Sequence, residues 1–214
     1  MSDINISVLY DERIYESPTL MKDAYFDLIR ECYWSQCGDS DKADKYTLRC
    51  IDWLESTDFF TAPASTKYHD SFQSGLLRHS LLVARNVAEL MKLSQFHNID
   101  TAEAILVALV HDWCKIDFYE EYQRNVKDDT TGQWYQQTAY RCKGSKIPLG
   151  HGVTSLYMAQ KFFKINTEQA LAIRWHMGDY TTSETEKYDL MEANKHPMVQ
   201  LIQIADKLAA TLPL

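Results

Sequence analysis

A long apolar run in the chain ends in two titratable side chains. In AILVALVHDWCKIDFY, residues 104–119, seven apolar residues lead directly into His111 and Asp112, and Lys115 follows three positions after the aspartate. A segment that is apolar on nearly every side is normally buried, so residues 102–115 are predicted to form a central helix. Titratable side chains at the end of a buried helix need partners, because an unpaired charge in an apolar interior is costly.

Hydrophobic spacing predicts further helices on both sides of this segment. Ser17 and Pro18 are typical of an N-cap and a first helical position, and they open a helix that continues to Trp34. Residues 37–44 are predicted to form a loop, and residues 60–75 a longer loop rich in turn residues. The other predicted helices cover residues 45–57, 76–93, 152–163, 168–177 and 196–212.

The pattern changes between Glu120 and Lys146. The stretch RNVKDDTTGQWYQQTAYRC contains strand-like segments around an Asp-Asp-Thr-Thr-Gly turn, which predicts a β-hairpin inserted at about residues 120–146. Such an insertion is either a surface decoration or a lid. In a lid, Tyr119, Trp134 and Tyr135 would stack on a base and the loop would set substrate choice.

Composition and charge narrow the classes of partner. The chain of 214 residues is 45% hydrophobic and 24% charged, as is typical of a soluble globular protein, and its net charge is −8. We therefore expect no long nucleic acid and no membrane surface as partner, because both require clustered lysine and arginine. No signal peptide or transmembrane run is visible. The five cysteines form no CxxC pair, which predicts free thiols in the cytoplasm.

Six imidazole and carboxylate groups fall at inward positions or at helix ends of the predicted elements. They are His79, His111, Asp112, His151, His176 and Asp206. Each one alone is explained by a hydrogen bond within the core. The set is better explained by a metal site, because all six groups favour the same cations. The other histidines are weaker candidates: His69 is a substrate contact or a surface residue, and His97 and His196 are predicted to be solvated.

The order of the six residues resembles the signature of a known superfamily. His79, the pair His111–Asp112 and Asp206 match the H…HD…D pattern of HD-domain metal-dependent phosphohydrolases. With His151 and His176 added, the set is similar to the six-ligand H…HD…H…H…D version. The segment STKYHDSFQSGLLRHSLLVA also resembles the opening of the HD domain in bacterial exoribonucleases of the YhaM type.

The resemblance implies an all-α fold, an HD-domain helical bundle around a metal or dimetal site, with the small β-hairpin inserted. Residues 46–214 would form this domain, and residues 1–45 an N-terminal helical extension. The implied ligands of a first divalent transition-metal ion are His79, His111, Asp112 and Asp206. The implied ligands of a second ion are His151 and His176, with Asp112 as the bridge. Mixed imidazole and carboxylate ligands favour iron or manganese here, with nickel, cobalt or zinc as alternatives.

The implied activity is hydrolysis of a phosphate ester of a small nucleotide, or of a related phosphomonoester or diester, by a metal-activated water. Lys115 lies one turn beyond the doublet and would contact the phosphate, unless it only caps its helix. Arg78 and Arg174 are sequence neighbours of ligands and, like His69, are candidate substrate contacts. Two alternatives stay open: an HD-fold di-iron oxygenase and a non-catalytic nucleotide-binding HD sensor.

Overall fold

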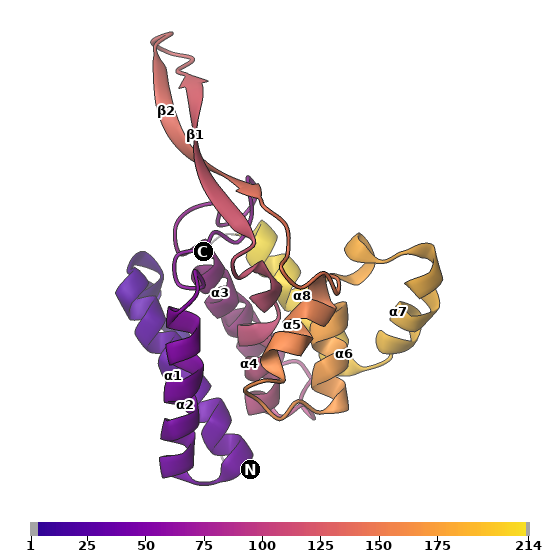
Figure 1. Cartoon of the computed structure of the whole chain (residues 1–214). Coiled ribbons are helices and arrows are strands. Elements are labelled where there is room, and N and C mark those ends of the chain that lie inside the picture. The colour runs from indigo at the N-terminus through magenta and orange to yellow at the C-terminus, as the bar shows by residue number, and fades with distance from the viewer. Residues whose placement is uncertain (1–3, 213–214) are drawn as a thin grey trace.

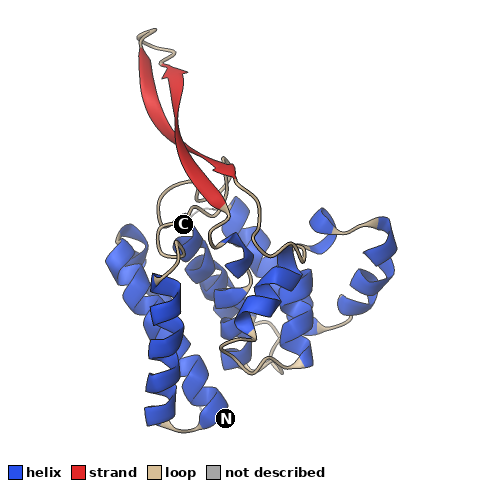
Figure 2. Ribbon diagram, in the orientation of Figure 1, coloured by secondary structure: helices blue, strands red, loops and turns tan. Residues whose placement is uncertain are grey.

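The computed structural model describes residues 4–212, a set of helices from which one β-hairpin projects (Figures 1 and 2). The α-helices are α1 (Pro18–Cys37), α2 (Ser40–Glu55), α3 (Gly75–Leu90), α4 (Thr101–Val110), α5 (His151–Ala159), α6 (Thr167–Trp175), α7 (Lys187–Ala193) and α8 (Pro197–Thr211). The strands are β1 (Tyr119–Lys127) and β2 (Trp134–Cys142). None of these helices is both long and apolar enough to cross a membrane. The predicted class, all-α with a small inserted hairpin, is confirmed.

Helix α4 lies at the centre of the bundle. It packs against α1, α3, α5, α6 and α8, and its residues 104–110 are all buried (Figure 1). The carboxylate of Asp100 caps its N-terminus by accepting the backbone N–H of Glu103. An apolar helix surrounded by five others needs no polar face, which explains its sequence.

Two predicted boundaries are wrong. The loop predicted at 37–44 is reduced to Gly38 and Asp39, because Gly38 closes α1 in the left-handed conformation and Asp39 directly caps α2. The central helix predicted to reach Lys115 ends at Val110, and Trp113–Lys115 forms a separate turn of 3-10 helix. The short helix α7 was not predicted, because a helix of about two turns is too short to show a clear apolar period. The other predicted helices form, with ends that differ by a few residues.

The N-terminal helix α1 belongs to the same hydrophobic core as the rest. The hydroxyl of Tyr25 donates a hydrogen bond to the carbonyl of Leu109, at 2.9 Å, and accepts one from the indole N–H of Trp113, at 3.0 Å. The hydroxyl of Tyr33 donates to the carbonyl of Phe162, at 3.1 Å. The predicted division at residue 45 falls within α2 and stays a prediction.

The hairpin strands pair antiparallel, from Tyr119 opposite Cys142 to Lys127 opposite Trp134. Most of its side chains are exposed, and it extends away from the helices (Figure 2). At its base, the hydroxyl of Tyr119 donates to the carbonyl of Ala64, at 3.2 Å. The base of the hairpin is thus tied to the 60–75 loop, while its tip is free of the bundle.

We predict that Tyr25→Phe lowers the free energy of unfolding by about 2–3 kcal/mol, because it leaves the Trp113 indole N–H and the Leu109 carbonyl without this partner in the core. Tyr33→Phe is the matched control, since it removes one hydrogen bond, and should cost about 1 kcal/mol. Urea denaturation of both variants measures the difference. An equal loss of unfolding free energy in both variants would show that the second hydrogen bond of the Tyr25 hydroxyl adds no stability.

Candidate metal centre

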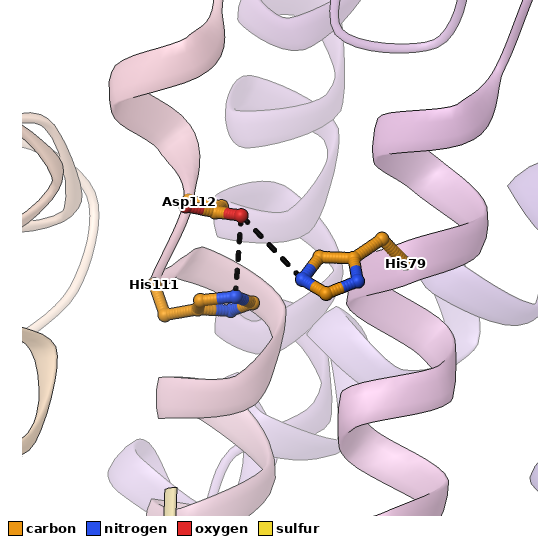
Figure 3. A group of neighbouring side chains, drawn as sticks. All are labelled: His79, His111 and Asp112. Atoms are coloured by element: carbon orange, nitrogen blue, oxygen red, sulfur yellow. Dashed lines mark ion pairs between the residues drawn. The ribbon is translucent and has the colours of Figure 1, made fainter. Parts of the chain in front are cut away.

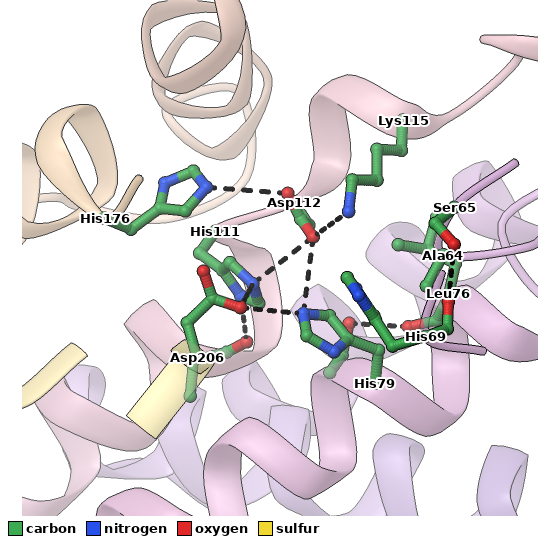
Figure 4. A network of polar contacts seen from close by, with 12 residues as sticks. Ala64, Ser65, His69, Leu76, His79, His111, Asp112, Lys115, His176 and Asp206 are labelled. Atoms are coloured by element: carbon green, nitrogen blue, oxygen red, sulfur yellow. Dashed lines mark hydrogen bonds and ion pairs between the residues drawn. The ribbon is translucent and has the colours of Figure 1, made fainter. Parts of the chain in front are cut away.

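The six predicted ligand side chains converge from five helices at the centre of the bundle. Figure 4 shows how His79, His111, Asp112, His176 and Asp206 point toward one another. His79 lies on α3, His151 opens α5 and Asp206 lies on α8. His111 and His176 are the residues directly after α4 and α6, and Asp112 follows His111. All lie at 2% relative exposure or less except His151 and Asp206, whose side chains are 25% and 15% exposed.

The helix ends orient two of the histidines. The Nδ1–H of His111 donates to the carbonyl of Ala108, at 2.7 Å, and that of His176 to the carbonyl of Ile173, at 2.8 Å. In both cases the acceptor lies three residues earlier, in the last turn of the helix. This hydrogen bond leaves Nε2 as the nitrogen that faces the centre, with its lone pair free for a ligand.

The two oxygens of Asp112 face two different pairs of histidines. Oδ2 lies 3.5 Å from Nε2 of His79 and 3.4 Å from Nε2 of His111 (Figure 3). Oδ1 lies 2.8 Å from Nε2 of His151 and 3.5 Å from Nε2 of His176. Asp112 therefore stands between two potential coordination sites, with one oxygen turned to each.

Asp206 completes the first of these sites. Its Oδ1 lies 3.0 Å from Nε2 of His79 and 3.9 Å from Nε2 of His111. Nitrogen and oxygen ligands lie about 2.1 Å from a transition-metal ion, so two ligand atoms of one ion can be at most about 4.2 Å apart. Each of these distances around Asp112 and Asp206 meets this limit, so the spacing of the residues is compatible with shared metal ions.

Within the described part of the chain, several enclosed imidazole nitrogens at the cluster lack a hydrogen-bond partner. Among them are the Nε2 atoms of His79, His111 and His176. A buried polar atom without a partner costs about 1–3 kcal/mol, so such atoms are rare in native proteins. A cation shared by these nitrogens and the carboxylates would satisfy them, which is the strongest structural argument that the cluster is a metal site.

Electrostatics keep the carboxylates ionised. Burial alone would raise the pKa of Asp112, but Lys115 and His111 outweigh it and hold that pKa well below its usual value. The Lys115 ammonium lies 2.6 Å from Oδ2 of Asp112. Burial alone would likewise lower the pKa of Lys115, but Asp112 outweighs it and raises that pKa. Lys115 is therefore a fixed positive charge beside the cluster.

His151 also depends on Asp112. Burial alone would lower its pKa, but hydrogen bonds to Asp112 and Cys114 outweigh this effect and raise the pKa to about 10. For Asp206, burial would raise the pKa, but the neighbouring His79 and His111 hold it below its usual value.

Two of the predicted substrate contacts border a pocket of about 500 Å³ beside the cluster. His69 and Arg78 line it together with Tyr68, Asp70, Phe72, Ala209 and Ala210. The ring of His69 lies 4.7 Å from that of His79, and burial followed by the charge of His79 lowers the pKa of His69 to about 4. Nη1 of Arg78 lies 2.6 Å from Oδ1 of Asp70, a buried partner that the sequence did not reveal.

The other candidates lie elsewhere. Arg174 pairs with Glu186 and lies 4.0 Å over the Trp175 ring, and within residues 4–212 no ion pair or hydrogen bond joins it to the six clustered residues. His97 is exposed, as predicted. His196, predicted to be solvated, is instead half-buried and pairs with Glu168 at 2.6 Å. That partner lies 28 residues away in the chain, so spacing could not indicate it.

Cys114 also lies at the cluster, although its place in the sequence did not identify it as a site residue. Its Sγ lies 3.2 Å from Nδ1 of His151, on the side of the ring away from Asp112. The residue is buried in the turn Trp113–Lys115. Its position between Asp112 and Lys115 was a signal, but a single cysteine in an apolar segment is ordinarily a packing residue.

A comparison with models of protein families shows which family this chain is related to. The model described as HD domain matches residues 76–211, more than half of the chain, and the match includes all six clustered residues. The chain belongs to the HD domain family. The resemblance predicted from the H…HD…D order is thereby confirmed, and members of this family are generally metal-dependent phosphohydrolases. Comparisons with curated proteins and with solved structures gave no significant match.

We predict that Asp112→Asn, which keeps the shape of the side chain and removes its charge, lowers the bound metal from two ions to fewer than one per chain. His176→Ala should release only one ion, because the other ligands of the first site remain. Elemental analysis after reconstitution with Mn²⁺ measures both variants, with His97→Ala as the exposed control. If His176→Ala lost as much metal as Asp112→Asn, Asp112 would have no bridging role.

Proposed function

We propose that the protein is a cytoplasmic HD-domain phosphohydrolase that hydrolyses a phosphate ester of a small nucleotide, or a related phosphomonoester or diester. His79, His111, Asp112 and Asp206 would hold one divalent transition-metal ion, and Asp112, His151 and His176 a second. Bound there, such ions supply a water of low pKa and positive charge against the phosphoryl oxygens. The observation that carries the proposal is the placement of the two Asp112 oxygens, each beside its own histidine pair.

Lys115 adds a charge that belongs to the chain itself. Its ammonium lies against Asp112, so Lys115 borders the cluster. Its side chain is 12% exposed, which leaves part of it accessible to a substrate. A raised pKa keeps it protonated at neutral pH, which prevents it from acting as a metal ligand. We assign it to a phosphoryl oxygen of the substrate, as a point charge that favours the more negative transition state.

His69 would orient the substrate and would not supply a proton. With a pKa lowered to about 4, its ring is neutral at pH 7 and can still donate or accept a hydrogen bond. Its Nε2 is buried and has no partner in the described residues. Because His69 stands between His79 and the pocket, it is placed to contact the ester group.

The pocket would hold the part of the substrate that does not react. Its exposed aromatic side chains, Tyr68 and Phe72, offer a surface for a flat ring. Its one arginine, Arg78, is already paired with Asp70, so the pocket has little free positive charge. This combination favours an uncharged ring, such as a nucleobase, over additional phosphate groups.

The direct test is a hydrolysis screen of purified protein loaded with Mn²⁺, Fe²⁺, Co²⁺ or Ni²⁺. Substrates should include mononucleotides, cyclic dinucleotides, dinucleoside polyphosphates, a short oligonucleotide and an aliphatic phosphate ester. Phosphate release from a small nucleotide supports the proposal. No hydrolysis, together with oxygen consumption by the iron-loaded protein, would favour an oxygenase with the same ligands. Binding of a nucleotide without turnover would favour a sensor.

We predict that Lys115→Ala lowers kcat/KM by about 10²–10³, the cost of losing one charged contact in the transition state. The metal content should stay unchanged, because the ammonium is not a ligand. Lys115→Arg should restore activity only in part, since a planar fork replaces a compact charge. Unchanged kcat/KM in Lys115→Ala would show that the lysine serves only as a partner of Asp112.

We predict that Phe72→Ala raises KM for a nucleoside monophosphate about tenfold, because base stacking on an aromatic side chain contributes about 1–3 kcal/mol. KM for an aliphatic phosphate ester should not change, since that substrate has no ring to stack. Tyr180→Ala, which removes an aromatic side chain that is 82% exposed and lies outside the pocket, is the matched control. An equal rise in KM for both substrates would show that the base does not stack on Phe72.

A further inference from the structure

The histidines of the cluster differ in how their outer nitrogen is held. His111 and His176 both follow a helix, so a carbonyl of its last turn accepts their Nδ1–H. His151 opens its helix instead, and no helical carbonyl precedes it. A histidine at a helix start therefore needs an acceptor from another element if its ring is to be fixed.

The side chain beside Nδ1 is a thiol, and a His151 ring that binds a metal through Nε2 would keep its proton on Nδ1 and donate it to this sulfur. Sγ of Cys114 lies 3.2 Å from Nδ1 of His151, while Nε2 of the same ring lies 2.8 Å from Oδ1 of Asp112. Cys114 is buried, whereas the His151 side chain is 25% exposed. The ring is thus held between a carboxylate on one side and a sulfur on the other, and the sulfur is the weaker acceptor.

The backbone of Cys114 is anchored independently of its side chain. Its N–H donates to the hydroxyl of Ser155, at 3.0 Å, and Ser155 lies on α5 one turn after His151. The turn Trp113–Lys115 packs against α5 as a whole. A change of the Cys114 side chain should therefore leave the turn in place and alter only the group that contacts Nδ1 of His151.

We propose that Cys114 is a positioning residue for the metal centre. Its sulfur accepts the Nδ1–H of His151, aims Nε2 toward Oδ1 of Asp112, and so controls occupancy of the position shared by Asp112, His151 and His176. The inference rests on the two-ion centre of the proposed function. Hydrogen bonds to the outer nitrogen of a metal-binding histidine commonly change metal affinity 10–100-fold, so a single thiol is enough to decide whether this position is filled.

The test compares Cys114→Ala and Cys114→Ser with Cys32→Ala, which removes a buried thiol from α1. Each purified protein is titrated with Co²⁺ and both dissociation constants are measured. We expect Cys114→Ala to bind one of the two ions about 10–100-fold more weakly and the other as in the unaltered protein. Cys114→Ser should keep both dissociation constants near those of the unaltered protein, because the serine hydroxyl oxygen can also accept the Nδ1–H of His151. Cys32→Ala should change neither constant.

Three results would overturn the inference. Unchanged binding in Cys114→Ala would leave the thiol a packing residue. A sulfur-to-cobalt charge-transfer band in the unaltered protein, absent in the alanine variant, would make Cys114 a ligand itself. Binding by Cys114→Ser as weak as by Cys114→Ala would show that hydrogen bonding to Nδ1 is not the cause. If the unaltered protein bound only one ion, both this inference and the two-ion centre of the proposed function would be wrong. The hydrolysis screen tests the proposed activity separately.

Discussion

One buried carboxylate organises the centre of this protein. Asp112 is 2% exposed, yet it stays ionised because positive and polar groups surround it on both sides. An isolated charge at this depth would destabilise the protein, so the neighbouring groups are a requirement of the fold as well as of any chemistry. The end of α4, the start of α5 and the end of α6 are all placed so that their polar side chains meet this group.

The helix termini accomplish this placement. Because His111 and His176 lie just past a helix end, the last carbonyls of α4 and α6 orient their rings. The start of α5 can approach the end of α6 because residue 152 is glycine: an added Cβ there would lie 2.2 Å from the Arg174 carbonyl oxygen. This close approach brings the rings of His151 and His176 to 5.2 Å. Backbone geometry at three helix ends thus builds the cluster.

Much of this arrangement could be predicted from the sequence. Periodicity shows which side chains point inward, so His79 and Asp206 were visible as polar residues on apolar faces. What periodicity cannot show is which inward side chain meets which across the core. The pairing of Arg78 with Asp70, of His196 with Glu168 and of Cys114 with His151 all join different elements, and so emerged only from the structure.

Anomalous X-ray scattering from crystals of the Mn²⁺-loaded protein would test whether Asp112 bridges two metal ions. We expect two anomalous peaks about 3.5–4 Å apart, one beside each oxygen of Asp112. The first peak should lie among His79, His111 and Asp206, and the second beside His151 and His176. A single peak at full occupancy, or two peaks that do not share Asp112, would contradict the bridging role of this carboxylate.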